Sequence, residues 1–233
     1  MSVRNNETTC DVDILDSSDD EQRAPAAKYN RLIFRVRKRI LREFSPRKEL
    51  FQFSVLEIAS GSGQHVDRIA LHFPHGLFQP SVDDPDLLAT LYAKKYFATN
   101  VKKPLLIDVC QKLSSYNFKE KSIDVIYNVN IISTYECTKG LFSNAGLYLK
   151  YNGIMITHGL YALNGVITSD GNIRFHDDDD ESLRSGNPPG SLIGLKDLIA
   201  LANENHLLLK EVTILPFEMK CFVWIKELPK AKK

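Results

Sequence analysis

The residues best suited to chemistry gather in one short stretch, Val55–His65, which reads Val-Leu-Glu-Ile-Ala-Ser-Gly-Ser-Gly-Gln-His. Its apolar beginning predicts a strand buried on both faces, as in a parallel sheet. Glu57, near the end of that strand, can accept hydrogen bonds from the amine or other donors of a ligand. Gly61 and Gly63 permit a sharp turn and let a ligand approach the backbone where a Cβ would block it. The following residues predict a helix whose first N–H groups face the turn, so the stretch predicts a site for a polar ligand.

A second candidate is an acid that follows the next predicted strand, His75–Val82. An acid at this place in a nucleotide-binding α/β unit binds ribose hydroxyls. Asp83 lies about 20 residues past Gly63, which is the spacing that this role needs. The alternative is that Asp83 and Asp84 only cap the helix that Pro85 begins. The sequence leaves both interpretations open.

Further strands and helices alternate along the chain, which predicts a parallel α/β sheet. We expect strands over 104–109, 123–130 and 154–158 and a helix over 135–150. Two apolar segments, 207–215 and 221–226, have a short connection and predict a terminal antiparallel hairpin. Residues 159–191 interrupt this rhythm with five Gly and an acidic run at 177–181. We interpret them as an irregular insertion that forms a substrate lid or wall, with the acidic run as solvated loop rather than a metal site.

The ends of the chain differ in composition from its middle. Residues 1–23 are acidic, with few large apolar groups, and predict a disordered tail. Residues 24–228 form the predicted domain, and 229–233 a basic tail. Within the domain, 26–44 has one apolar stripe and a basic remaining surface. A helix packed on the sheet edge explains that pattern better than binding to a membrane or RNA.

Bulk properties exclude several classes of protein. The 233 residues suit one domain, and a net charge of +1 gives no field that would steer the chain toward nucleic acid or an acidic membrane. The four cysteines form no CxxC pair, which argues against a zinc site and a disulfide framework. Cys110 and Cys221 are expected to be buried thiols of a reducing compartment. Neither a secretory signal nor a run of about 20 apolar residues is visible, so we expect the cytosol or the nucleus.

Four features together resemble the class I S-adenosylmethionine-dependent methyltransferases. They are the alternating strands, the Glu-x-x-x-Gly-x-Gly turn that begins at Glu57, the acids after the second and third strands, and the closing hairpin. This resemblance implies a Rossmann-like α/β fold with a mostly parallel seven-stranded sheet and a terminal antiparallel hairpin. A dinucleotide oxidoreductase more often carries Gly-x-Gly-x-x-Gly, and the third Gly position is Val66 here.

A narrower resemblance spans roughly residues 25–227 and concerns an uncharacterised methyltransferase-like family of bacteria and animals. It is carried by Pro25-Ala26-Ala27-x-x-Asn30, Leu56–His65, Phe73-Pro74-His75, Gln79-Pro80-Ser81, Pro104–Val109, Asn130-Ile131-Ile132, Leu141-Phe142-x-x-Ala145 and Gly194-Leu195-Lys196-Asp197.

The chain also departs from that family at several strand ends, where open α/β sheets bind ligands. Val82 replaces an Asp and Ser133 a His, while His158–Tyr161 replaces Tyr-Gly-Pro-Phe and Leu215–Met219 replaces Met-Pro-Ala-Asn-Asn. The cofactor turn is kept and the presumed substrate side is changed, which implies an altered substrate or reduced activity.

The resemblance implies S-adenosylmethionine as cofactor and leaves the substrate, a small molecule or a protein, unassigned. Asp83 would hold the ribose and Asp108 with Val109 the adenine. On the substrate side, His158 is the candidate base, with a structural histidine as the alternative. The full cofactor set is Glu57, Ala59, Ser60, Gly61, Gly63, Gln64, His65, Asp83, Asp108, Val109 and Asn130, and the substrate side adds Asn30, His158 and Tyr161 to Asn130.

Two other function classes remain open. The first is a non-catalytic binding module that engages a partner through the basic helix and the acidic tail. The second, a nucleic-acid methyltransferase, is disfavoured because Asn128–Ile131 stands where an Asn/Asp-Pro-Pro-Tyr motif would follow the fourth strand. We expect no metal and no membrane partner, and a monomer or weak oligomer.

Overall fold

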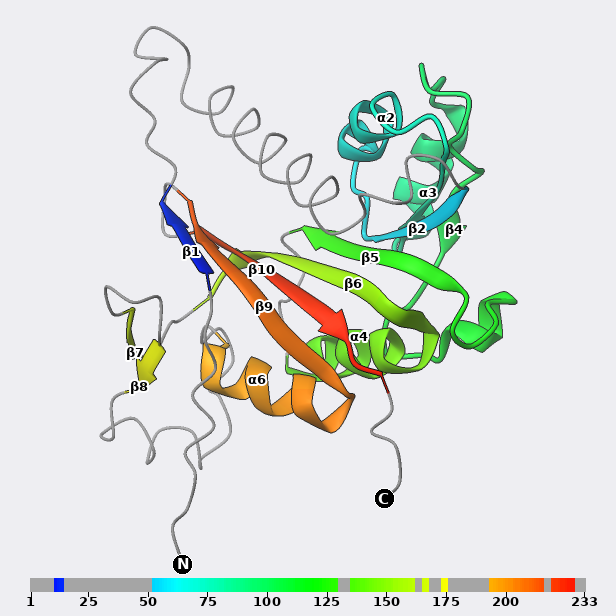
Figure 1. Ribbon diagram of the computed structural model, residues 1–233. Coiled ribbons are helices and arrows are strands. Elements are labelled where there is room, and N and C mark those ends of the chain that lie inside the picture. Colours follow the sequence, from blue (N-terminus) through cyan, green and yellow to red (C-terminus); the bar gives the residue numbers. More distant parts are fainter. Residues whose placement is uncertain are drawn as a thin grey trace, which may run out of the picture.

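A single eight-stranded sheet forms the centre of the protein (Figure 1). The computed structural model describes residues 11–14, 52–129, 135–161, 165–167, 173–175, 193–215 and 219–228. The strand order is β1-β9-β10-β6-β5-β2-β3-β4. The strands are β1 (Asp11–Ile14), β2 (Phe53–Ile58), β3 (Gly76–Val82), β4 (Leu105–Leu106), β5 (Ile123–Val129), β6 (Leu149–Leu160), β9 (Leu207–Ile214) and β10 (Met219–Lys226).

The directions of the strands confirm the predicted α/β fold. β2 is parallel to β3 and β5, β3 to β4, and β5 to β6. β10 runs antiparallel to both β6 and β9 and forms the expected terminal hairpin. The chain leaves β2 in one direction through β3 and β4, and returns on the other side of β2 with β5 and β6. This reversal places a topological switch point beside the carboxyl end of β2, where open α/β sheets bind ligands.

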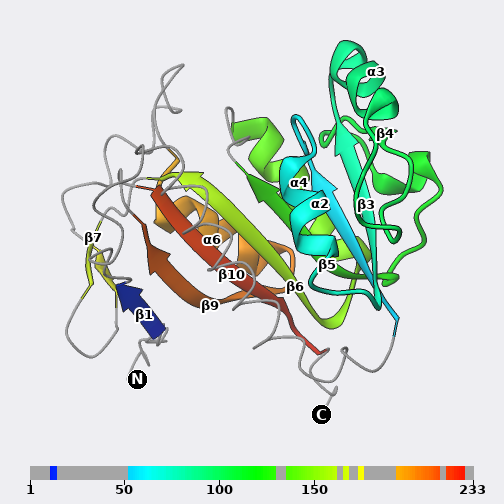
Figure 2. The same cartoon turned by 90° about the horizontal axis from the view of Figure 1, so that it is seen from above.

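Helices cover both faces of the sheet (Figures 1 and 2). α4 (Tyr135–Tyr148) and α6 (Leu195–Glu204) lie on one face, and α2 (Gln64–Ala70) on the other. Because side chains alternate along a strand, Leu56 and Ile58 face α4 and α6, whereas Val55 faces α2. α3 (Pro85–Ala93) contacts β3 and β4, and the 3-10 helix η2 (Leu113–Tyr116) is hydrogen-bonded to α4 through Asn144 and Tyr148.

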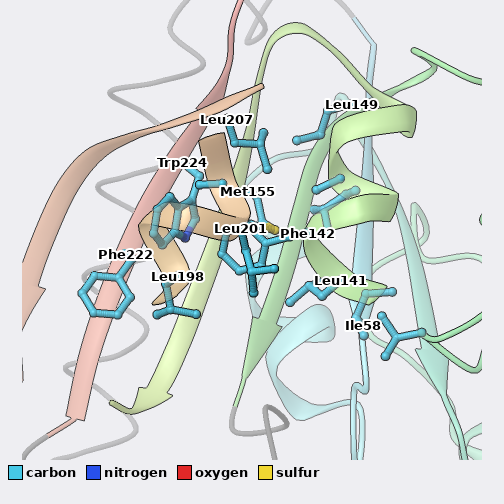
Figure 3. Packing of buried hydrophobic residues seen from close by; sticks show 14 of the residues in the cluster. Ile58, Leu141, Phe142, Leu149, Met155, Leu198, Leu201, Leu207, Phe222 and Trp224 are labelled. Atoms are coloured by element: carbon cyan, nitrogen blue, oxygen red, sulfur yellow. The ribbon is translucent and has the colours of Figure 1, made fainter. Parts of the chain in front are cut away.

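Aliphatic side chains form most of the core under α4 and α6, and Phe142, Phe222 and Trp224 pack among them (Figure 3). Trp224 of β10 packs edge-on against Phe142 of α4, with ring centroids 5.0 Å apart and planes at 76°. The indole Nε1 of Trp224 donates to Thr157 Oγ1 at 3.0 Å, so this buried polar group is satisfied. The terminal hairpin is therefore fixed to the parallel part of the sheet by packing as well as by backbone pairing.

Three details differ from the sequence-based expectations. Asp11–Ile14, within the tail expected to be disordered, form β1 and pair in parallel with Glu211–Ile214 of β9. The acidic composition of 1–23 gave no sign of this pairing, because the edge of β9 supplies the backbone partners. β6 continues through Leu160, and β7 (Gly165–Ile167) pairs with β8 (Ile173–Phe175), so the 159–191 insertion is not wholly irregular. The third predicted strand, 104–109, is reduced to the two residues of β4.

The predicted helix over 26–44 with Asn30, Asn130, the acidic run at 177–181 and the tail 229–233 lie outside the described residues. Among the described residues, no helix combines the length and the apolar character needed to cross a membrane. Cys221 is buried as expected, whereas Cys110 is exposed, which corrects the expectation of a buried thiol there.

Candidate functional site

The turn after β2 is built on three left-handed residues at alternate positions. The φ angles of Ala59, Gly61 and Gly63 are 57°, 52° and 67°. A Cβ on Gly63 would lie 2.8 Å from the Cδ2 atom of Leu91, so packing against α3 requires glycine there. A Cβ on Gly61 would meet nothing within 4 Å. Gly61 therefore presents backbone to open space, as a turn that receives a ligand must.

Polar groups of both neighbouring strands hold this turn in place. From β3, Ser81 Oγ donates to Glu57 O at 2.7 Å and Ser81 N to Ser60 Oγ at 3.1 Å, while Ser60 N donates to Ser81 O at 2.7 Å. From β5, Asn128 Nδ2 donates to Ile58 O at 3.3 Å. The sequence predicted Ser60 for the site, but not Ser81 or Asn128 as anchors. A signal was present, because both are polar residues one position before the last residue of mostly apolar strands.

A buried carboxylate lies behind the turn. Glu57 is 1% exposed, on the face of the sheet that α2 covers. Burial, followed by the charges of Glu57 and Asp67, raises the pKa of Tyr96 to about 12. The Tyr96 hydroxyl also lies 3.0 Å from the place that a Cβ on Gly63 would take. The turn is thus enclosed on this side by a buried carboxyl group and a neutral phenol.

The helix after the turn, α2, is a weaker candidate for ligand contact than its place in the sequence suggested. Gln64 is exposed and His65 is half-buried in the first turn of α2. α2 has only seven residues and no side-chain cap, so its dipole is short. The backbone of the turn, rather than the helix end, is the main candidate for ligand contact.

Asp84, rather than Asp83, caps the helix that follows β3. Asp84 is the N-cap of α3, and its Oδ1 atom accepts from Asp86 N at 2.7 Å and Leu87 N at 3.5 Å. Asp83 takes no part in this cap and is exposed directly after Val82, the last residue of β3. Asp83 is therefore exposed at the carboxyl end of β3, and its ribose role stays a prediction.

The loop after β4 carries the two predicted adenine contacts. Asp108 is exposed, and its Oδ1 atom accepts from Cys110 N at 2.9 Å. The side chain of Val109 is buried. Asn144 of α4 fixes the loop: its Nδ2 atom donates to Val109 O and Gln111 O, both at 2.9 Å. Asn144 was not predicted from the sequence, because nothing around it in the predicted helix indicates a role.

The two described candidates on the substrate side lie in the core. His158, 1% exposed, is inside β6 and is paired in register with Val129 and Cys221. Tyr161, also 1% exposed, packs on Phe222 with ring centroids 5.0 Å apart. Burial raises the pKa of Tyr161, so its hydroxyl stays protonated. The structure thus brings together the turn, Asp83 and the Asp108 loop at the carboxyl ends of β2, β3 and β4, but it buries His158 and Tyr161.

Solved structures similar to this chain are methyltransferases. The CurJ carbon methyltransferase matches with a TM-score of 0.63 and 17% identity over 89% of this chain and 56% of that chain. A putative sarcosine dimethylglycine methyltransferase from Galdieria sulphuraria matches at 0.61 and 11%, over 85% of this chain and 88% of that one. The geranyl diphosphate C-methyltransferase of Streptomyces coelicolor A3(2), crystallised with S-adenosyl-L-homocysteine, matches at 0.55 and 10%, over 96% and 93%. This chain spans about half the length of several of these structures, for example 55% of the DszA carbon methyltransferase.

The strand order, the glycine turn and these likenesses define the class: the protein has the Rossmann-like fold of the class I methyltransferases. Within that class, the chain belongs to the family described as "Protein of unknown function (DUF938)", whose model matches residues 21–226.

Proposed function

We propose that this protein binds S-adenosylmethionine and transfers its methyl group to a small molecule or a protein side chain. The observation that carries the proposal is the turn itself, where Ala59, Gly61 and Gly63 share left-handed backbone and Gly61 opens to free space. Similar folds crystallised with S-adenosyl-L-homocysteine or S-adenosyl-L-methionine add support.

The residues present fit such a cofactor by their chemistry. The carboxyl group of Glu57, behind the turn, would accept hydrogen bonds from the amino group of the cofactor. Asp83, at the end of the neighbouring strand, would accept from ribose hydroxyls. Asp108 and Val109 would border the adenine, the first as a hydrogen-bond acceptor and the second as an apolar surface. When bound, the cofactor supplies an electrophilic methyl group on a sulfonium.

The contribution of the protein would be proximity and orientation, which can supply much of the rate of a displacement reaction. The rigidity that orientation needs is visible in the Ser81 and Asn128 anchors of the turn. Val82 and Ser133, which replace an Asp and a His of the similar family, support our proposal that the substrate has diverged.

One observation favours a second candidate function, a non-catalytic module. Both described residues proposed to face the substrate, His158 and Tyr161, are buried. A methyltransferase fold that kept its cofactor turn but lost its substrate side would leave a binding or scaffold protein.

Calorimetry with S-adenosylmethionine and S-adenosyl-L-homocysteine tests cofactor binding. We expect binding by the full chain and its loss in Gly61→Arg, because an arginine there would occupy the space that the ligand needs. Asn152→Arg is the matched control. Asn152 is also exposed and left-handed, with φ of 61°, but it lies near the start of β6, away from the switch point.

Equal binding by Gly61→Arg and Asn152→Arg would contradict the placement of the ligand at the turn. An absence of binding to the unmodified chain would reject the methyltransferase proposal. The non-catalytic module would be favoured if the chain binds S-adenosylmethionine but forms no S-adenosyl-L-homocysteine when a cell extract of metabolites and proteins is added.

A further inference from the structure

Two cysteines meet beside the loop that follows β4. Cys110 lies in that loop and Cys137 is the third residue of α4. Their Sγ atoms are 3.9 Å apart, with the thiol of Cys110 directed at the sulfur of Cys137. Cys110 is exposed and Cys137 is half-buried, so a small reagent can reach the pair from solvent.

The backbone around the pair holds the two thiols together. A Cβ on Gly140 would lie 2.5 Å from Val109 O and 3.1 Å from the Cα atom of Cys110, so the loop rests directly on α4. Asn144 ties the same loop to the same helix through Val109 O and Gln111 O. Because these contacts are made on either side of Cys110, the thiols stay close without any bond between them. A disulfide requires their sulfur atoms to approach to about 2.05 Å.

The surroundings of the two thiols are unequal. Cys137 is half-buried in the first turn of α4. Cys110 is exposed as a residue, but partial desolvation of its thiol, followed by Cys137 and Asp108, raises the pKa of Cys110 to about 11. Cys110 is therefore protonated at neutral pH and suited to react second, after Cys137.

We propose that Cys110 and Cys137 form a reversible disulfide, with a hydroperoxide as oxidant, that fastens the loop after β4 to the start of α4. The thiolate of Cys137 attacks one peroxide oxygen and breaks the O–O bond, which gives a sulfenic acid and hydroxide. The Cys110 sulfur then attacks the sulfenic sulfur and forms the S–S bond. Its proton and the departing hydroxide leave as water, so two thiols and one hydrogen peroxide give one disulfide and two waters.

The disulfide also offers a link to ligand binding, and this part rests on the proposed function. Cys110 N donates to the Asp108 carboxylate, so drawing Cys110 toward α4 moves the carboxylate that would border the adenine. We expect oxidised protein to bind S-adenosylmethionine at least threefold more weakly than reduced protein.

Peptide mapping of the full chain tests the disulfide directly. The protein is treated with one to five equivalents of hydrogen peroxide, alkylated without reductant and digested with trypsin. We expect a linked pair of peptides, 103–112 with 122–139, that disappears after dithiothreitol. Cys110→Ser and Cys137→Ser should abolish it, whereas Cys10→Ser, which removes a thiol elsewhere in the sequence, should not.

Alkylation of both cysteines without a linked peptide, or sulfinic acid at Cys137 in place of the link, would overturn the proposal. Calorimetry of the reduced and oxidised forms separates the two ideas. Equal affinity of the two forms would reject the coupling. No binding to either form would reject the proposed function and leave the disulfide, established by peptide mapping, intact.

Discussion

Asn144 offers the sharpest test of how this fold holds its candidate site. Its side chain is 5% exposed on α4 and spans three backbone groups of the loop after β4. Nδ2 donates to Val109 O and Gln111 O, and Oδ1 accepts from Leu113 N at 3.0 Å. Asn144→Ala removes all three hydrogen bonds and leaves the segment attached to α4 by packing and by the bond from Ser114 N to the Tyr148 hydroxyl at 2.8 Å.

The expected loss follows from those contacts. Each hydrogen bond contributes about 1 kcal/mol net, and a buried group left without a partner loses more than that. Alanine in place of asparagine raises helix propensity by about 0.6 kcal/mol, which offsets part of the loss. We therefore expect Asn144→Ala to lower the free energy of unfolding by about 2–3 kcal/mol.

Urea unfolding followed by circular dichroism measures this change, provided that the slope of the transition is unchanged. Asn203→Ala is the matched control, an exposed asparagine in α6 for which we expect no loss. Asn144→Asp keeps the acceptor but loses both donors, so it should be no more stable than Asn144→Ala at neutral pH. A loss below about 0.5 kcal/mol for Asn144→Ala would refute the idea that Asn144 holds the loop to α4, because substitution of an exposed side chain gives a change of that size.

Three further predictions concern the turn, Tyr96 and the contact of the loop with α4. Ala59→Gly should keep or slightly raise the urea midpoint, because glycine relieves about 1 kcal/mol of left-handed strain but increases the entropy of the unfolded chain. Ala59→Val should lower the free energy of unfolding by at least about 2 kcal/mol. Equal midpoints for the two variants would contradict a strained backbone at Ala59. The pKa of Tyr96 is raised from 10.0 to about 12, so between pH 10 and 12 the Tyr96 hydroxyl is ionised in the unfolded chain but protonated in the folded protein. Unfolding then releases a proton, and stability falls as pH rises through this window. Tyr96→Phe should show a shallower fall in urea titrations across that window, and an identical slope would count against the shift. Gly140→Ala places a Cβ 2.5 Å from Val109 O, so it should destabilise by about 1–3 kcal/mol despite the better helix propensity of alanine, and a stabilised variant would show that the loop yields.

Much of the fold follows from local pattern. The apolar runs of β2, β5 and β6 and the capping residues of α3 stand in the sequence as they stand in the structure. The antiparallel β9–β10 pair was predictable because a short connection permits little else. β1 was not, because it depends on the backbone edge of β9, some 200 residues away in the chain.

The sequence by itself determined the backbone of the turn after β2. Gly61 and Gly63 are left-handed because only glycine adopts that conformation without strain, and Asp83 follows its strand at a fixed spacing. The sequence also predicted Asp84 as the cap of α3, directly before Pro85, and the hydrogen bond from Asp86 N to Asp84 confirms it.

Only the tertiary structure could bury His158 and Tyr161, bring Asn144 to the loop after β4, and set Cys110 beside Cys137. A strand-end histidine and a mid-helix asparagine have no local pattern that reveals their neighbours. Their surroundings come from the crossing of strands and helices that lie far apart in the chain, so local residue pattern does not reveal them.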